Sequence, residues 1–468
     1  MGFRDKEFRR SIFVIALPII IQQLATSSLN FIDVIMVGRL GETSIASVGL
    51  SSNFTFIYIC LLNGISTGAS IFAAQFWGKK EVHHVRSVLG FSLLLSLSVS
   101  LLFSFASIFF PGRILSIYTN DPEVIEQGRI FLRLVGFSFV ATSITFCYSA
   151  VLRSIGNAKI PMFVSVFALS LNTLLNYLLI FGNLGFPALG LKGSAIATLV
   201  SRLVEFGLIV SSVYIFKIPL VFKRIRDFFS VGSGFVRKYF ITTLPLILGI
   251  TFWSLGLNFY NISYAHIGTQ AVAAYSVAGT VEQIAFVVFT GLSGACNVLI
   301  GNRIGAGHKD KVLSYSRSFI WLAFTGSLIV GACIYLLSGP VLTLYSMSAE
   351  AHTTARTLLL LMSCFLCVKV VNMILIQGVL NAGGDTVFTF VQNSAAMWAV
   401  GFPMAYIAVY RLHLPIYWVY IFIMSEEFAK LIIGVPRFLS KKWIHNLTEN
   451  TAYPNQRGQS EEWIENSM

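Results

Sequence analysis

Charged residues are scarce in this chain. Only 11% of its 468 residues are Asp, Glu, Lys or Arg, whereas 56% are hydrophobic. Because about a quarter of the residues in a water-soluble domain are charged, this composition excludes a soluble globule. The mean hydropathy of +0.76 agrees, and the sequence predicts a polytopic membrane protein.

Cysteine and histidine are also rare, with six Cys and seven His. All six cysteines lie in apolar segments, so the Cys364-x-x-Cys367 spacing is interpreted as packing in lipid and not as a metal or redox site. The histidines fall mostly in loops. We therefore expect no enzyme and no organic cofactor, since a membrane-embedded enzyme needs His, Cys or paired carboxylates gathered at one depth.

Long apolar segments make up most of the chain. A membrane-spanning helix needs about 17 to 25 apolar residues, and twelve such segments begin near residues 12, 46, 87, 124, 160, 191, 239, 271, 318, 358, 388 and 415. The first follows the basic run Lys6 to Arg10 and is too long for a signal-peptide core. The sequence predicts an all-α membrane protein with twelve transmembrane helices.

The chain is also a tandem repeat. Identical residues recur 227 positions apart without a gap, from Pro18 and Pro245 to Gly156 and Gly383. This repeat predicts two pseudo-symmetric six-helix lobes in the same orientation, as in carriers that bind substrate at the junction between two halves. The predicted parts are an amino lobe at 1–216, a cytoplasmic linker at 217–237, a carboxy lobe at 238–442 and a cytoplasmic tail at 443–468.

Basic residues alternate between loops. Most of the 33 Lys and Arg residues lie at the amino terminus, in every second loop and after the last apolar segment. Because cytoplasmic loops carry the positive excess, we expect a multi-pass protein of the cell (inner) membrane with both termini in the cytoplasm. The net charge of +13 then faces anionic membrane lipids and requires no nucleic acid. We expect a monomer.

An ionisable residue inside an apolar segment is costly and marks a candidate site. Asp33 is the clearest case, at roughly 10 Å below the outer boundary when about 1.5 Å is counted per residue. The same count places Asn172, Asn176 and Thr198 at a similar depth. The oxygen atoms of these four side chains are suitable ligands for Na⁺. Alternatively, the three neutral side chains surround the Asp33 carboxylate, which takes up a proton. The alternative for the two asparagines is hydrogen bonding between helices as packing.

The second half carries different ionisable residues. At the offset of 227, Asp33 corresponds to Tyr260, so the second lobe lacks this carboxylate. Glu282 and Lys369 have opposite charge and lie near the predicted membrane centre. Either they form a structural ion pair, or Glu282 is a second proton-binding or cation-sensitive group.

Two further charged pairs are three residues apart, Arg202 with Glu205 and Glu427 with Lys430. This spacing places both members on one helix face. We interpret them as local structural pairs near cytoplasmic helix ends. The sequence Gly383-Gly384-Asp385 follows no strand and is interpreted as a turn, not as a phosphate-binding loop.

Several motifs in register resemble the multidrug and toxic compound extrusion family. They are Leu17-Pro18, Gly38-Arg39-Leu40-Gly41, Gly64 to Ala69, Gln75 to Gly78, Gly301 to Gly307, Gly383 to Thr386 and Arg437 to Trp443. The resemblance runs from about residue 8 to residue 446. It implies two six-helix lobes around a central cleft, which export cationic or amphipathic organic compounds against Na⁺ or H⁺.

The resemblance also implies roles for individual residues. The family's amino-lobe cation site is similar to Asp33, Asn172, Asn176 and Thr198. Members with a second carboxylate have it where this chain has Asn176, which leaves Na⁺ and H⁺ open as the coupling ion. The acidic pair that some members carry on helices seven and ten falls on neutral residues here, and that site is not carried over.

Aromatic and Met side chains are expected to line the cleft, because they hold cations and flat apolar molecules without strict geometry. Phe31, Trp253 and Tyr260 are the candidates. A flippase for a lipid-linked sugar or cell-wall precursor is the alternative function. Such carriers place several basic residues in the cavity, whereas Lys369 is the one central basic residue that the sequence indicates. A channel is disfavoured because no reentrant segment is recognisable.

Overall fold

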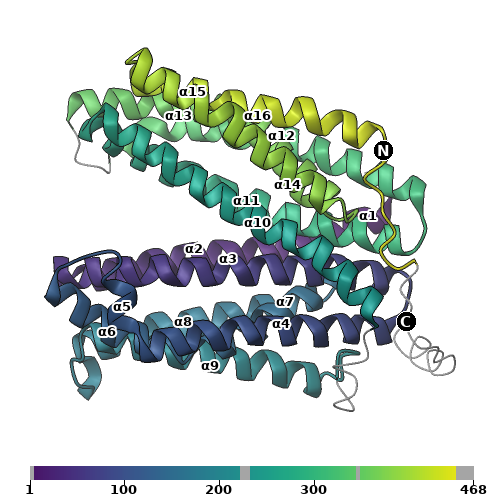
Figure 1. Ribbon diagram of the computed structural model, residues 1–468, viewed down its shortest axis with the longest axis horizontal. Coiled ribbons are helices and arrows are strands. Elements are labelled where there is room, and N and C mark those ends of the chain that lie inside the picture. The colour runs from purple at the N-terminus through teal and green to yellow at the C-terminus, as the bar shows by residue number, and fades with distance from the viewer. Residues whose placement is uncertain (1–4, 222–231, 344–347, 450–468) are drawn as a thin grey trace. The chain divides into compact units, whose positions relative to one another are not determined.

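The computed structural model describes residues 5–221, 232–343 and 348–449. Much of the predicted linker, at 222–231, and most of the predicted tail, at 450–468, lie outside the described residues, so these two predictions stay untested. Every regular element within the described ranges is a helix (Figure 1). The predicted all-α class is confirmed.

The first half contains six helical segments. Three consecutive elements form the first segment, and α6 and α7 form the fourth, with a bend of 49° between them. The elements are α1 (Lys6–Ser11), the π-helix η2 (Ile12–Ala16), α2 (Leu17–Gly38), α3 (Glu42–Gly78), α4 (Val82–Phe109), α5 (Pro111–Leu115), α6 (Pro122–Gly136), α7 (Phe139–Ser154), α8 (Lys159–Phe181), the 3-10 helix η3 (Asn183–Gly185) and α9 (Leu191–Ile215).

The second half repeats this pattern. The fourth segment of this half is α13 with η5, and the fifth runs from α14 to η7, so the described residues again form six segments. The elements are α10 (Ser233–Ile267), α11 (Thr269–Gly305), α12 (Lys309–Leu342), α13 (Ala349–Met373), η5 (Ile374–Leu380), α14 (Thr386–Ala395), η6 (Ala396–Gly401), α15 (Phe402–Tyr406), η7 (Ile407–Arg411) and α16 (Ile416–Leu439), where η5, η6 and η7 are π-helices.

Most of these segments are long and apolar enough to cross a membrane. Among the described residues nine helices qualify, or ten when the bent pair α6 and α7 counts as one span. The other two predicted spans are interrupted by polar residues, Gln392 to Ser394 in the segment from α14 to η7 and Glu426, Glu427 and Lys430 in α16. The chain is a multi-pass membrane protein of twelve helical segments.

The described residues form two compact units. The amino unit holds residues 21–221, 232–243 and 448–449, and the carboxy unit holds residues 5–20, 244–343 and 348–447. The divisions between the two units fall within α2, after Ile20, and within α10, after Thr243. Residues 5–20 belong to the carboxy unit even though they precede the first lobe's remaining helices in the chain.

Specific contacts explain this assignment. Phe8 packs against the rings of Tyr315 and Phe319 in α12, with centroid distances of 4.7 and 5.2 Å, and Glu7 pairs with Arg303 of α11. In the amino unit, the ring of Tyr239 stacks on Phe72 at 5.4 Å. Aromatic packing thus anchors the first turn of α1 and the second turn of α10, which the hydropathy pattern does not specify.

A short turn joins η5 to α14, as predicted for Gly383 to Asp385. Gly384 has a φ of 77°, which favours glycine. Asp385 accepts two hydrogen bonds from Arg437, at 2.7 and 3.1 Å, and lies 3.6 Å from Nε2 of His445. Burial raises the pKa of Asp385, but the hydrogen bonds and charges of His445 and Arg437 outweigh it and hold that pKa below its ordinary value.

We predict that Asp385→Asn lowers stability at neutral pH by about 1.5–3 kcal/mol, the usual contribution of hydrogen bonds to a charged group. Because the folded pKa is depressed, the stabilisation is present above the unfolded pKa and is lost as the pH falls through the folded pKa. The melting temperatures of wild type and variant in detergent are therefore expected to converge in acid. A difference that is constant across pH contradicts this.

Close helix packing in the carboxy unit depends on Gly291 of α11. A Cβ atom built there would lie 2.5 Å from Cγ1 and 2.9 Å from the backbone nitrogen of Ile20. Small residues at such crossings let helices approach closely in membranes. By contrast, a Cβ atom on Gly279 of the same helix meets nothing within 4 Å.

We predict that Gly291→Ala destabilises the protein by about 1–3 kcal/mol, as overpacking of a close contact usually does. Gly279→Ala is the matched control on α11 and is expected to leave the melting temperature unchanged or slightly raised, because Ala is the better helix former. Thermal unfolding of both purified variants decides the matter. Equal melting temperatures for the two variants rule out the packing role of Gly291.

Candidate functional site

The four residues predicted at one depth come together in the amino unit. Asp33 lies on α2, Asn172 and Asn176 lie one turn apart on α8, and Thr198 lies on α9. Helices α8 and α9 are side by side (Figure 1), because the chain reverses after α8 at Gly182, whose φ is 73°. The depth count from the sequence places these residues at one level, and the structure brings them together across α2, α8 and α9.

Both oxygens of Asp33 have an amide donor within reach. Nδ2 of Asn176 donates to Oδ1 of Asp33 at 2.9 Å. The amide of Asn172 satisfies its neighbours best when its nitrogen donates to Oδ2 of Asp33 at 2.7 Å and its oxygen accepts from the backbone N–H of Thr198 at 3.2 Å. Two neutral amide donors therefore hold the carboxyl group of Asp33 in place.

The Asn172 amide has a second possible partner. When it is turned by half a rotation, its oxygen accepts from Nδ2 of Asn176 at 3.3 Å. Oδ1 of Asn176 itself is buried and has no hydrogen-bond partner among the described residues. Since buried polar atoms are nearly always paired, this oxygen marks a position for a proton donor, a water or a cation.

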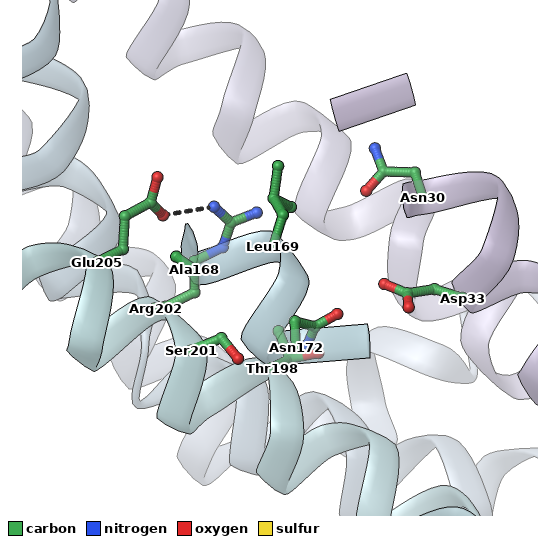
Figure 2. Close-up of a pocket in the computed structure, with 9 residues that line it drawn as sticks. All are labelled: Asn30, Asp33, Ala168, Leu169, Asn172, Thr198, Ser201, Arg202 and Glu205. Carbon is green, nitrogen blue, oxygen red and sulfur yellow. Dashed lines mark hydrogen bonds and ion pairs between the residues drawn. The ribbon is translucent and has the colours of Figure 1, made fainter. Parts of the chain in front are cut away.

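A cavity of about 130 Å³ lies beside Asp33. Figure 2 shows Asn30 and Asp33 on one side of it and residues of α8 and α9 on the other. Binding sites for drug-sized molecules usually measure about 300–1,000 Å³, so this cavity fits an ion or a few waters and not an organic substrate. Its lining residues are Asn30, Asp33, Ala168, Leu169, Asn172, Thr198, Ser201, Arg202 and Glu205.

Arg202 and Glu205 form the predicted local pair, with Nη1 and Oε2 2.8 Å apart. The sequence interpretation missed that this pair lines the same cavity as Asp33 (Figure 2). The spacing of Thr198, Ser201 or Arg202, and Glu205 is three or four residues, which puts them on one face of α9, and this signal was sufficient to find them. With Asp33, Arg202 and Glu205 ionised, the cavity carries a net charge of −1.

A chain of hydrogen bonds continues from Glu205. Its Oε1 accepts from the hydroxyl of Ser165 at 2.9 Å, and that hydroxyl accepts from Nε2 of Gln22 at 2.9 Å. Glu205 is only 5% exposed. Its two oxygens are therefore both engaged, and Asp33 is the carboxylate in this cavity with neutral donors alone.

The carboxy unit brings Glu282 and Lys369 together. Nζ of Lys369 donates to Oε1 of Glu282 at 2.6 Å and lies 5.3 Å from the centroid of the Tyr420 ring. The two charged groups thus form the ion pair that was one of the two interpretations of the sequence. A role of Glu282 in ion coupling stays a prediction.

The three aromatic residues predicted to line a cleft differ in exposure. Phe31 is 62% exposed and Trp253 is 48% exposed, so both rings are free to contact a ligand or lipid. Tyr260 is 6% exposed, and its hydroxyl donates to Oε2 of Glu426 at 2.5 Å. Tyr260 is therefore held inside the carboxy unit, and a lining role stays a prediction for all three.

Comparison with known proteins gives consistent matches over nearly the whole chain. The MatE family model matches residues 18–178 and 245–407, which begin 227 residues apart, as the internal repeat does. The "Uncharacterized transporter YisQ" of Bacillus subtilis is 26% identical over 94% of this chain and 96% of its own length. The "Probable multidrug resistance protein NorM" of Thermotoga maritima is 24% identical, with 93% of both chains covered.

Solved structures share the fold. One described as the outward-facing conformation of a multidrug resistance MATE family transporter of the MOP superfamily has a TM-score of 0.85 and 23% identity, and covers 94% of this chain and 97% of its own. Another, a MATE in complex with MaL6, has a TM-score of 0.84 and 23% identity, with coverage of 93% and 96%. At this identity, the structural likeness bears on the fold alone.

We predict that Arg202→Met destabilises the amino unit by about 3–5 kcal/mol, because it leaves the buried Glu205 carboxylate without its charge partner. The double variant Arg202→Met with Glu205→Gln is expected to recover most of that loss. Thermal unfolding of the two single variants and the double variant gives the coupling energy of the pair. Additive single effects contradict the pairing.

Proposed function

Because the chain belongs to the MatE family, we propose that it is a cation-coupled antiporter that exports cationic or amphipathic organic compounds by alternating access. We place it in the cell (inner) membrane as a monomer with both termini in the cytoplasm. Na⁺ or H⁺ is the coupling ion in this proposal. The names of relatives such as the multidrug resistance protein NorM of Thermotoga maritima support the choice of substrate class.

The environment of Asp33 carries this proposal. A carboxylate held by two amides beside a small polar cavity of net charge −1 is balanced by one monovalent cation or one proton. A carboxylate within a membrane-spanning segment has a high free-energy cost, and such residues usually mark a binding site or a transport pathway. Oδ1 of Asn176, which has no hydrogen-bond partner among the described residues, adds a further acceptor beside Asp33.

Asp33, Asn172, Asn176 and Thr198 are the residues that we propose hold the ion. Asparagine amides suit this task because each side chain can turn either its nitrogen or its oxygen toward Asp33. When the nitrogen faces Asp33, it stabilises the ionised carboxylate of the ion-free site. When the oxygen faces Asp33, it adds a ligand for Na⁺. A proton on Asp33 instead removes the charge that the amide nitrogens stabilise.

Export needs only that ion and organic substrate favour different conformations. An ion that binds more tightly to one conformation shifts the population toward it, and the shift is limited by the difference in affinity. The cavity beside Asp33 is too small for a drug, so the two ligands occupy different places. Exposed aromatic rings such as Phe31 and Trp253 are suited to the organic cation.

The test is efflux of a fluorescent organic cation from proteoliposomes under a Na⁺ gradient and, separately, a pH gradient. For wild type we expect efflux driven by at least one gradient, and that gradient names the coupling ion. Asp33→Asn is expected to reduce gradient-driven efflux to the level of liposomes without protein. Glu126→Gln, at a carboxylate that is 65% exposed on α6, is the matched control and is expected to keep wild-type efflux.

Two results contradict the proposal. Gradient-driven efflux that survives Asp33→Asn moves the coupling site elsewhere. Correctly folded wild-type protein without efflux under either gradient excludes the proposed substrate class, and the lipid-linked precursor flippase then becomes the better hypothesis.

A further inference from the structure

The apolar segments of the second half contain an uneven set of charges. Among the described residues, five largely buried charged side chains lie within α11, α13 and α16: the carboxylates of Glu282, Glu426 and Glu427 and the ammonium groups of Lys369 and Lys430. The exposed fraction of these five side chains lies between 5% and 17%. When all five are ionised, the buried set has a net charge of −1, which is costly away from water.

The excess charge belongs to one group of three residues. Lys369 and Glu282 form a neutral pair at 2.6 Å. Lys430 is shared by two carboxylates of its own helix, Oε1 of Glu426 at 2.5 Å and Oε1 of Glu427 at 2.9 Å. One ammonium group cannot balance both carboxylates, so Glu426 and Glu427 together carry one uncompensated charge.

Glu427 has the surroundings of an ionised carboxylate. Its Oε1 accepts from Lys430 and its Oε2 accepts from Nδ2 of Asn372 at 2.7 Å. Both oxygens thus face N–H donors, which favour the charged form. If a proton neutralises the excess charge of this group, it is therefore not expected on Glu427.

Glu426 has a different partner on its second oxygen. Oε2 is hydrogen-bonded to the hydroxyl group of Tyr260 on α10, with the two oxygens 2.5 Å apart. A hydroxyl group both donates and accepts, so this contact accommodates a proton on either oxygen. No such freedom exists at Glu427, where the partners are N–H groups.

The backbone leaves space for this contact. A Cβ atom on Gly401 would lie 2.1 Å from the hydroxyl oxygen of Tyr260 and 2.7 Å from Oε2 of Glu426. Gly401 ends the π-helix η6, and π-helical turns often occur at functional sites. Any side chain at this position would displace the Tyr260 to Glu426 hydrogen bond.

We propose that the carboxy unit contains a proton-binding site in which Glu426, hydrogen-bonded to Tyr260, holds one proton in the resting protein. The proton comes from water, and its binding changes the net charge of the five-residue set from −1 to zero. The proposal rests on the carboxy unit alone and is independent of drug export and of Asp33.

Other occupants fit less well. Both oxygens of Glu426 are already engaged, one by Lys430 and one by Tyr260, and the adjacent ammonium group repels a metal cation. The ionisable groups around the site are, from α16, Glu427, Lys430 and Tyr420; from α10, Tyr260 and Tyr264; from α11, Tyr275 and Glu282; and from α13, Lys369.

Infrared spectroscopy of the purified protein at neutral pH tests the proposal, since a protonated carboxyl group has its own C=O stretching band, which shifts in D₂O. The measurement is made in the Asp33→Asn background, so that a proton on Asp33 does not contribute. We expect one such band, which disappears with Glu426→Gln and persists with Glu427→Gln. Both substitutions preserve side-chain size, and gel filtration with thermal unfolding checks that each variant is folded.

Two further variants probe the neighbours. Tyr260→Phe removes the hydrogen bond and is expected to move the band to higher frequency while it persists. Lys430→Met removes the ammonium group, so the area of the band is expected to rise about twofold, because the buried Glu427 carboxylate loses its counter-charge and takes up a proton as well. An absent band, a band that survives Glu426→Gln, or a band that Na⁺ abolishes overturns the proposal.

Discussion

The cost of placing charge in lipid is the constraint on which the rest of this structure depends. Backbone groups meet it by forming helices, which pair every N–H and C=O within one segment. Side chains meet it through partners. Within the described residues Arg202 is paired with Glu205, Lys369 with Glu282, and Lys430 with two glutamates.

The two units meet this constraint differently, although they are built from one repeat. In the amino unit the first helix supplies the carboxylate itself, Asp33, and two asparagines of α8 stabilise it. In the carboxy unit the corresponding residue is Tyr260, and the carboxylate beside it, Glu426, comes from the last helix. A carboxyl group thus lies at this position in the amino unit, bound by amide N–H groups, and beside it in the carboxy unit, bound by the Tyr260 hydroxyl and the Lys430 ammonium group.

The fold and the position of Asp33 are predictable from the sequence because they follow from one-dimensional quantities. Segment length, charge placement and the repeat predict twelve helices, and counting along each helix predicts that Asn172, Asn176 and Thr198 lie level with Asp33. The rotation of a helix about its axis is not fixed in this way. For that reason the sequence did not reveal that Glu426 meets Tyr260.

In each unit the buried ionisable side chains described above sum to −1 when all are ionised, and a single positive charge restores neutrality. A bilayer tolerates a neutral site far better than a charged one, so a bound cation or proton would lower the cost of burying these groups. In the proposed antiport, an organic cation and the neutralising ion need only favour different conformations and need not share one pocket. The small size of the cavity beside Asp33 supports this separation, since it admits the ion and excludes the organic molecule.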